Sequence, residues 1–170
     1  MNRRYAVVET RLGEVVLVAD DASLVGLYFP HHWYKPSVNT FGVRVDVADD
    51  LLFAETRRQL DEYLGGSRTT FDLPTSTDGD AWQETVWALL GEIPYGRTTT
   101  YGDLAERLGD ASLAQAVGQA VGRNPLCVIV PCHRVVGSDG SLTGYAGGVR
   151  RKRFLLELEE PAEVKSGKLF

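Results

Sequence analysis

The chain carries the sequence VIVPCHRVV at residues 128–136, which places a thiol directly beside an imidazole after a short apolar run. Pro131 has no backbone N–H and interrupts regular strand pairing, which predicts a turn with Cys132 at the mouth of a strand. On extended backbone, Cys132 and His133 would point to opposite sides of the chain. A thiol displayed next to a base is either a nucleophile or a metal ligand, so the choice depends on the other residues.

The cysteine and histidine count favours a nucleophile. Cys127 and Cys132 are the two cysteines, and a disulfide scaffold of this size would normally carry more. His31 and His32 lie far from them in sequence, and no C-x-x-C or H-x-x-x-H spacing exists, so structural zinc is not expected. Cys127 follows the pattern of a small buried core residue rather than a second reactive thiol.

Composition and charge set outer limits on function. The 170 residues are 44% hydrophobic and 24% charged, enough for one substantial core or two small ones. No apolar stretch is long enough to cross a bilayer, and no signal region is evident, so we expect a cytoplasmic protein without a membrane partner. A net charge of −5 argues against purely electrostatic nucleic-acid binding. The basic cluster at residues 150–153 is interpreted as a solvated helix face.

Residues 1–73 are predicted to form an amino-terminal α/β unit. Strand-like runs lie at residues 5–8, 15–19, 24–29 and, more briefly, 71–73. Residues 50–64 predict a helix that ends at Gly65, with an apolar face containing Phe53, Leu60 and Leu64. Residues 30–49 show no period and are interpreted as a long loop, with His31, His32 and Trp33 in an irregular surface segment.

Residues 74–80 form a polar, turn-rich linker candidate, and residues 81–160 form a second, mostly helical unit. Asp80 and Gln83 have the spacing of a capping box. Thr100 is expected to cap a helix over residues 101–108, and Ser112 a helix over 113–121, which together make a helix-turn-helix.

The second of these helices is unusual for a reader of the major groove, because its residues are mostly small. The small residues are Ala114, Ala116, Gly118 and Ala120, and they would allow close approach to a flat surface or a narrow groove. Farther along, residues 145–148 predict a flexible loop, residues 150–159 a last helix, and residues 161–170 a mobile tail.

Several short motifs occur in a characteristic order. They are IPYG at 93–96, TY at 100–101, AVG at 116–118, NP at 124–125, IVPCHRVV at 129–136 and GYAGG at 144–148. In this order they resemble the O6-alkylguanine-DNA alkyltransferases, also called methylated-DNA–protein-cysteine methyltransferases. The resemblance is dense from about residue 80 to 159 and looser over residues 1–73. It implies an α/β (α+β) protein of two domains, an amino-terminal ribonuclease H-like α/β domain and a mostly helical catalytic domain with a helix-turn-helix.

The resemblance implies a single-turnover DNA repair protein. A damaged base in double-stranded DNA is rotated out of the duplex, and Cys132 takes the alkyl group from O6 of guanine or, by extension, O4 of thymine. Displacement at an alkyl carbon needs a strong, soft nucleophile, and a thiolate meets that need without an oxyanion hole. Neither a cofactor nor a metal is implied. The expected partner is duplex DNA carrying O6-alkylguanine, bound by a monomer that needs no other protein.

Catalytic roles follow from the resemblance position by position. His133 takes the thiol proton through a water molecule, and Glu159 orients the imidazole. Tyr101 crowds the phosphate and assists protonation of the departing guanine. Asn124 ties the recognition helix to the active-site turn. Without the resemblance, Glu159 reads as a surface residue near a helix end, and Tyr101 as ordinary packing.

Substrate and DNA binding are implied for a larger set of residues. Backbone groups of Cys132, Val135 and Ala146, with Tyr145 nearby, are expected to line the pocket for the extruded base. The full set comprises Ala114, Gln115, Gly118, Arg134, Val135, Tyr145, Ala146 and Gly147.

Gln115 occupies the position where the family commonly has an arginine that fills the space of the extruded base. Glutamine can still form hydrogen bonds to the orphaned cytosine, but it brings no charge to the phosphates, so weaker DNA binding or slower base extrusion is expected. Ser112 and Gln115 also have capping-box spacing, which allows Gln115 to fold back on its own helix.

Three other functions are considered. A damage sensor would bind alkylated bases without repairing them, but relatives of that kind lack the cysteine. A methylation-triggered regulator would need a further metal-binding domain. A cysteine hydrolase would need an acyl pocket and an oxyanion hole, and would release product repeatedly.

Overall fold

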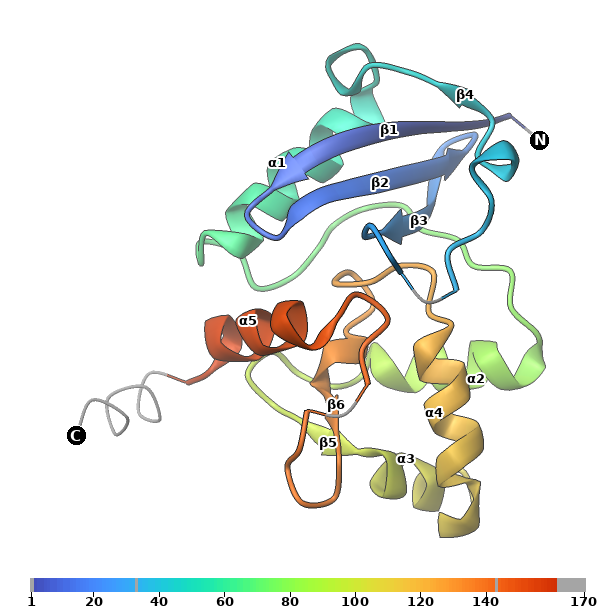
Figure 1. Ribbon diagram of the computed structural model, residues 1–170, viewed down its shortest axis with the longest axis vertical. Coiled ribbons are helices and arrows are strands. Elements are labelled where there is room, and N and C mark those ends of the chain that lie inside the picture. Colours follow the sequence, from blue (N-terminus) through green and yellow to red (C-terminus); the bar gives the residue numbers. More distant parts are fainter. Residues whose placement is uncertain (1, 33, 143, 162–170) are drawn as a thin grey trace.

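The amino-terminal part of the molecule is a small, mainly antiparallel sheet backed by one helix (Figure 1). The structure is a computed structural model that describes residues 2–32, 34–142 and 144–161. Trp33 and most of the expected tail lie outside the described residues. The strands and helix of this part are β1 (Arg3–Thr10), β2 (Gly13–Asp20), β3 (Ser23–Tyr28), β4 (Val43–Arg44) and α1 (Leu51–Leu64).

Strand order in the sheet is β3-β2-β1-β4, with antiparallel pairing except between β1 and β4, which are parallel. The five central residues of β2 are buried on both faces. Val15, Leu17 and Ala19 join the main core, whereas Val16 and Val18 pack with Tyr28 and Phe41 on the opposite face. The three expected strands and the helix over residues 50–64 are therefore confirmed.

The carboxy-terminal part is mostly helical and lies at the other end of the molecule (Figure 1). Its elements are α2 (Ala81–Leu90), β5 (Thr99–Thr100), α3 (Tyr101–Arg107), α4 (Ala114–Gly122), β6 (Val135–Val136) and α5 (Val149–Glu159). β5 and β6 form a short parallel pair. Asp80 and Gln83 form the predicted capping box, and Thr100 caps α3. α3 and α4 pack together as the expected helix pair.

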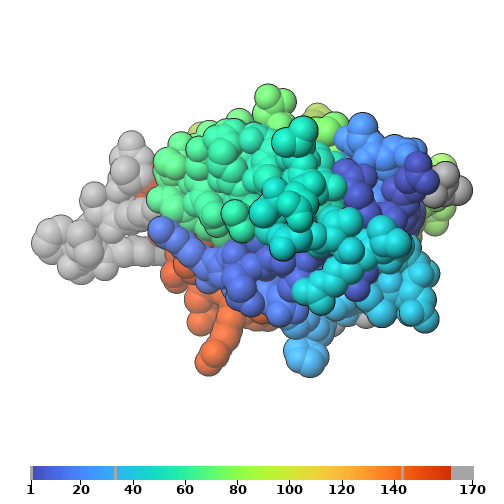
Figure 2. Space-filling view, turned by 90° about the horizontal axis from the view of Figure 1, so that it is seen from above, coloured from blue at the N-terminus to red at the C-terminus, as the bar shows by residue number. Residues whose placement is uncertain are grey.

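One hydrophobic core joins the two parts. It runs from Ala6 and Phe53 in the first to Leu104, Val117 and Leu155 in the second. The segment expected to be a linker begins against the sheet, because Leu24 N–H donates to Pro74 O at 2.8 Å and Ser76 N–H donates to Leu24 O at 3.0 Å. Figure 2 shows the amino-terminal part covering one whole end of the molecule, with α1 and the segment after β3 on its surface. Among the described residues, no helix combines the length and hydrophobicity needed to cross a bilayer.

Two expectations for the amino-terminal part are wrong. Residues 30–49 are not irregular throughout: they contain β4 and short 3-10 helices at Val38–Thr40 and Val47–Asp49. Gly42 allows the approach to β1, since a Cβ there would lie 1.9 Å from Arg3 O. Residues 71–73 form no strand, because the side chain of Gln59 takes both backbone groups of Asp72, at 2.8 and 2.9 Å.

Three expectations for the carboxy-terminal part also fail. Residues 128–130 form a tight turn instead of a strand, closed by Val130 N–H to Leu126 O at 2.8 Å, with Val128 at φ 73°. α4 has no side-chain cap: Asp110, not Ser112, caps the preceding 3-10 turn Ala111–Leu113. The loop at residues 145–148 is packed rather than exposed over its first three residues, since Tyr145, Ala146 and Gly147 are buried.

Candidate active site

Cys132 lies at the bottom of a small pocket at the base of the helix pair. It is the first residue of a 3-10 turn, Cys132–Arg134, that leads into β6, so the expected extended conformation of Cys132 and His133 is not found. Cys132 is 3% exposed and faces a pocket of about 230 Å³. The pocket is lined by Tyr101, Gly118, Val121, Gly122, Cys132, Gly144, Tyr145 and Ala146.

The turn that precedes Cys132 is fixed by Asn124. Its side-chain amide donates to Val130 O at 2.9 Å, and its Oδ1 accepts the N–H of Leu126 at 3.0 Å. Asn124 is 1% exposed and directly follows the end of α4. The Asn124 side chain therefore holds the turn that leads to Cys132.

His133, the next residue after Cys132, pairs with Glu159 at the end of α5. His133 Nε2 and Glu159 Oε2 are 2.6 Å apart, and both side chains are buried. Burial, with the nearby charges of Arg134 and Lys152, holds the pKa of His133 well below its usual value, so the imidazole is neutral. Its hydrogen is then on Nε2 and is donated to the carboxylate. Nδ1 is buried and has no hydrogen-bond partner among the described residues, which leaves its lone pair able to accept a proton.

Glu159 is held by side chains from both parts of the molecule. The hydroxyl of Tyr63, on α1, donates to Oε2, and Arg134 Nε donates to Oε1 at 2.7 Å. Burial raises the pKa of Glu159 to about 8. The positive charge of the adjacent Arg134 guanidinium acts to lower this pKa. His133, Tyr63 and Arg134 each donate a hydrogen bond to the Glu159 oxygens, so this arrangement stabilises the ionised carboxylate. Glu159 is 2% exposed, so it is no surface residue.

Arg134 does not reach the pocket, although DNA or substrate binding was expected of it. Its Nη1 donates to Ile93 O at 2.6 Å, and its Nη2 donates to the Tyr63 hydroxyl at 3.2 Å. These bonds, together with the one to Glu159, direct the guanidinium into the protein. The structure gives Arg134 the position of a support for the carboxylate.

Lys152 is a buried group that the sequence reading missed. It shares the inner face of α5 with Leu155 and Glu159, at a spacing of three and seven residues. Its Nζ donates to Val135 O at 2.6 Å, and burial lowers its pKa to about 8. The basic cluster is thus only partly a solvated face. Arg151 also turns inward and donates to Leu12 O at 2.8 Å.

The thiol of Cys132 is surrounded by groups that favour its ionised form. Its pKa is lowered, first by a hydrogen bond with Cys127 and then by Asn124 and the charge of Lys152, while burial opposes the shift. The two sulfur atoms are 3.9 Å apart. Cys127 is completely buried in the core, as expected, but this sulfur contact was not anticipated.

An open groove lies beside the pocket along α4. It is lined by Tyr34, Tyr101, Ala114, Gln115, Gly118, Gln119 and Gly122. Gln115 is exposed in this groove rather than folded into a capping box. Gly118 is close to Tyr101, since a Cβ there would lie 3.7 Å from the tyrosine ring. Val135, expected to line the pocket, lies outside it, and its carbonyl accepts a hydrogen bond from Lys152. Gly147, expected to bind substrate or DNA, also lies outside the pocket and packs against Phe29.

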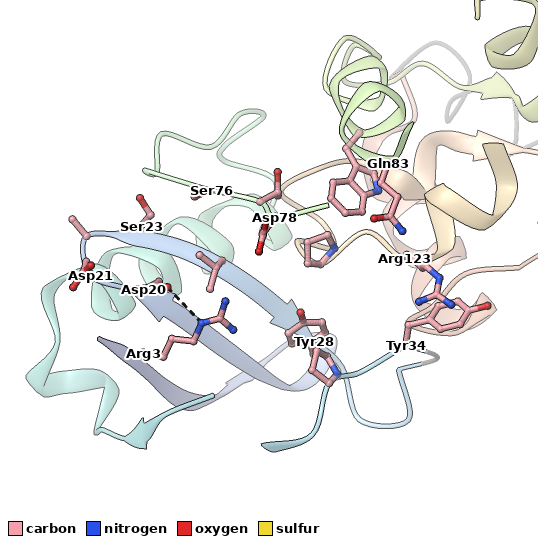
Figure 3. A pocket seen from close by; sticks show the side chains of 16 residues that line it. Arg3, Asp20, Asp21, Ser23, Tyr28, Tyr34, Ser76, Asp78, Gln83 and Arg123 are labelled. Carbon is pink, nitrogen blue, oxygen red and sulfur yellow. Dashed lines mark ion pairs between the residues drawn. The ribbon is translucent and has the colours of Figure 1, made fainter. Parts of the chain in front are cut away.

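A larger hollow of about 840 Å³ lies away from this chemistry, between the sheet and α2 (Figure 3). It holds the ion pair of Arg3 with Asp20, at 3.5 Å, and Arg123 stacked over Tyr34. It contains neither the thiol nor the imidazole, so its size does not make it the active site. Within the described residues, no group of three histidine, cysteine, aspartate or glutamate side chains is arranged to hold a metal ion.

Comparison with known proteins gives a match for both parts of the molecule. Residues 81–161 match the family model of the 6-O-methylguanine DNA methyltransferase DNA binding domain, and residues 3–77 match that of its ribonuclease-like domain. A methylated-DNA–protein-cysteine methyltransferase of Methanosarcina acetivorans is 41% identical over 155 residues, which cover 91% of this chain and 97% of the relative.

Solved structures give the same result. The O6-methylguanine methyltransferase of Mycobacterium tuberculosis superposes with a TM-score of 0.81 at 38% identity, covering 97% of this chain and 99% of that one. A structure of Mycobacterium tuberculosis OGT in complex with DNA superposes with a TM-score of 0.80 at 37% identity, covering 95% and 97%. The protein therefore belongs to the 6-O-methylguanine DNA methyltransferase family.

Proposed function

We propose that the protein repairs alkylated DNA by moving the alkyl group from O6 of guanine onto its own Cys132, once per molecule. The observation that carries this proposal is a thiol that faces a pocket and is followed in the chain by the imidazole of a buried imidazole–carboxylate pair. The bond from the sulfur to the alkyl carbon forms as the bond from that carbon to O6 breaks. Because a thioether has no ready hydrolysis route, the protein is consumed by one repair.

Proton transfer follows from the arrangement behind the pocket. His133 Nδ1 takes the proton of Cys132 through a bridging water, and Glu159 stabilises the imidazolium that forms. Tyr63 and Arg134 fix the carboxylate. The departing guanine requires a proton, and Tyr101, whose ring lines the same pocket, supplies a hydroxyl at its wall. Burial raises the pKa of Tyr101, so this hydroxyl is protonated at neutral pH.

Recognition of the lesion is assigned to the pocket and to α4. Unstacking a base and placing it in a pocket is how proteins reach atoms that are buried in a duplex. Tyr145 and Ala146 form one wall and Gly118 the other, with Ala114 and Gln115 on the adjoining groove. A solved relative in complex with DNA supports DNA as the partner, and we infer that the DNA is a duplex. We infer action as a monomer without a protein partner, and O4-alkylthymine as a second substrate.

The domains are taken as residues 1–73 and 81–160, with 74–80 as the linker, which the family matches over 3–77 and 81–161 support. A reaction that needs a reduced thiol fits the cytoplasm, where thiols are kept reduced.

Stoichiometry tests the proposal. A duplex carrying one O6-methylguanine is added to a fixed amount of protein in increasing excess, and repaired guanine is counted. Repair should stop at one equivalent, and Cys132→Ser should repair none. Repeated turnover would indicate a hydrolase, and tight binding without repair would indicate a damage sensor.

A further inference from the structure

A second chain of contacts reaches the nucleophile from the amino-terminal part. Cys127 Sγ lies 3.9 Å from Cys132 Sγ and 3.8 Å from Nε2 of His32. All three side chains are buried, with exposures of 6% for His32, 0% for Cys127 and 3% for Cys132. His32 was expected on a surface loop, but it packs edge-on against Tyr28 and is stacked beside Phe29.

The hydrogen positions in this chain follow from its first contact. The backbone N–H of Phe29 donates to His32 Nδ1 at 3.4 Å, so Nδ1 is an acceptor. Burial lowers the pKa of His32 to about 4, so the ring is neutral at physiological pH and carries one hydrogen. That hydrogen must then be on Nε2, which faces Cys127 Sγ and donates to it.

In the second contact either sulfur has the geometry to donate, and Cys127 is assigned as the donor because its pKa is raised while that of Cys132 is lowered. A thiol that accepts a hydrogen bond on its sulfur can still donate its own S–H, and the neighbouring acceptor is Cys132 Sγ. The pKa of Cys127 is raised well above its usual value, first by the contact with Cys132 and then by burial. Cys127 therefore keeps its proton, whereas the pKa of Cys132 is lowered.

We propose that His32 and Cys127 are positioning residues for alkyl transfer: His32 holds the Cys127 thiol so that its S–H donates to Cys132 Sγ and stabilises the attacking thiolate. This inference rests on the proposed function. No proton leaves Cys127 during the reaction. The proton of Cys132 still leaves through His133, and the S–H bond stabilises the negative charge that remains until the bond to the alkyl carbon forms.

Other groups around Cys132 act in parallel and must be separated from this effect. They are His133, Asn124, Tyr101, Tyr145 and Lys152, and they come from α3, α5, the 3-10 turn Cys132–Arg134 and the loops around the pocket. The effect of these groups on Cys132 does not depend on His32. Substitution at His32 or Cys127 therefore tests the second chain of contacts while the imidazole–carboxylate pair stays intact.

The experiment compares Cys127→Ala, Cys127→Ser and His32→Phe with the unmodified chain. Alkylation of Cys132 by iodoacetamide, located by peptide mapping, is followed from about pH 5 to about pH 10, and transfer from an O6-methylguanine duplex is measured in parallel. Cys127→Ala should move the half-maximal rate to higher pH by about one unit, which is about tenfold slower at neutral pH, with recovery at high pH. Cys127→Ser, which keeps a hydroxyl donor, should move it less, and His32→Phe should move it in the same direction.

Two results would overturn the proposal. One is an unchanged pH profile in Cys127→Ala. The other is a rate reduced equally at every pH, which indicates a packing defect and not a lost donor. His31→Asn is the matched control, because His31 is exposed at φ 59° and asparagine tolerates that backbone. A shifted iodoacetamide profile without any transfer from DNA would support these positioning residues while refuting the proposed function.

Discussion

The hydroxyl of Tyr63 offers a sharp test of how the amino-terminal domain supports the active site. Tyr63→Phe removes one oxygen that donates to Glu159 and accepts from Arg134. The ring remains stacked on Phe71, with centroids 4.8 Å apart, so packing is preserved. A buried hydrogen bond to a charged group contributes about 1.5–3 kcal/mol, and here both partners stay buried. We expect the free energy of unfolding to fall by about 2–3 kcal/mol.

Urea unfolding at neutral pH measures this loss, with Tyr95→Phe as the matched control. The hydroxyl of Tyr95 is only half-buried and donates to Leu158 O at 3.4 Å, so its removal should cost less than about 1 kcal/mol. Alkyl transfer should also slow in Tyr63→Phe and not in the control, because the carboxylate that orients His133 is less well fixed. Equal stability and equal rates for the two variants would refute this account of Glu159.

Three further outcomes are expected. Burial lowers the pKa of His32 from 6.5 to about 4. Between these pH values the unfolded chain binds more protons than the folded chain, so the free energy of unfolding falls as the pH drops through this window. The loss of unfolding free energy reaches about 3 kcal/mol. In urea titrations, the unfolding free energy of His32→Phe should depend less steeply on pH than that of the unmodified chain; an identical slope in the two proteins would contradict this. Gln115→Arg should strengthen duplex binding by on the order of 1 kcal/mol and steepen the logarithmic salt slope by about one, and no change in either would disprove the role given to Gln115. Gly147→Ala should destabilise the fold by about 1–3 kcal/mol, because the added Cβ would lie 2.5 Å from the ring of Phe29. In the same thermal melts Gly102→Ala should not destabilise the fold, because the nearest atom to its Cβ would be 3.8 Å away.

The sequence predicted the helices and strands that are determined by residues close together in the chain. The capping box at Asp80 and Gln83 and the cap at Thr100 were predictable, because a short polar side chain satisfies the free N–H groups of the helix that follows. The three antiparallel strands β1, β2 and β3 were equally clear. The apparent cap at Ser112 failed because Asp110, two residues earlier, forms the competing turn.

Long-range contacts account for most of what the sequence did not reveal. Residues 128–130 are apolar like a strand, but the backbone of Val130 forms hydrogen bonds with the Asn124 side chain and the Leu126 carbonyl, which close a turn. β4 was missed because two residues carry no period, and its pairing with β1 depends on Gly42.

The active site shows the same division. Cys132 and His133 were found because they are adjacent in one motif. Tyr63 and His32 were not, because each comes from the amino-terminal domain and meets its partner only in the folded chain. One signal was available for Tyr63: it lies three residues after Leu60 on the apolar face of α1, where a tyrosine brings a hydroxyl into the core. The amino-terminal domain thus does more than cover the catalytic domain, since it holds both Glu159 and Cys127.

The destination of the alkyl group tests the central claim most directly. The protein is mixed with a duplex carrying one O6-methylguanine, and its intact mass and peptide map are recorded. The account predicts a single added methyl group, located at Cys132 and absent in Cys132→Ser. Repaired DNA with unmodified protein, or a methyl group on Cys127, would contradict it.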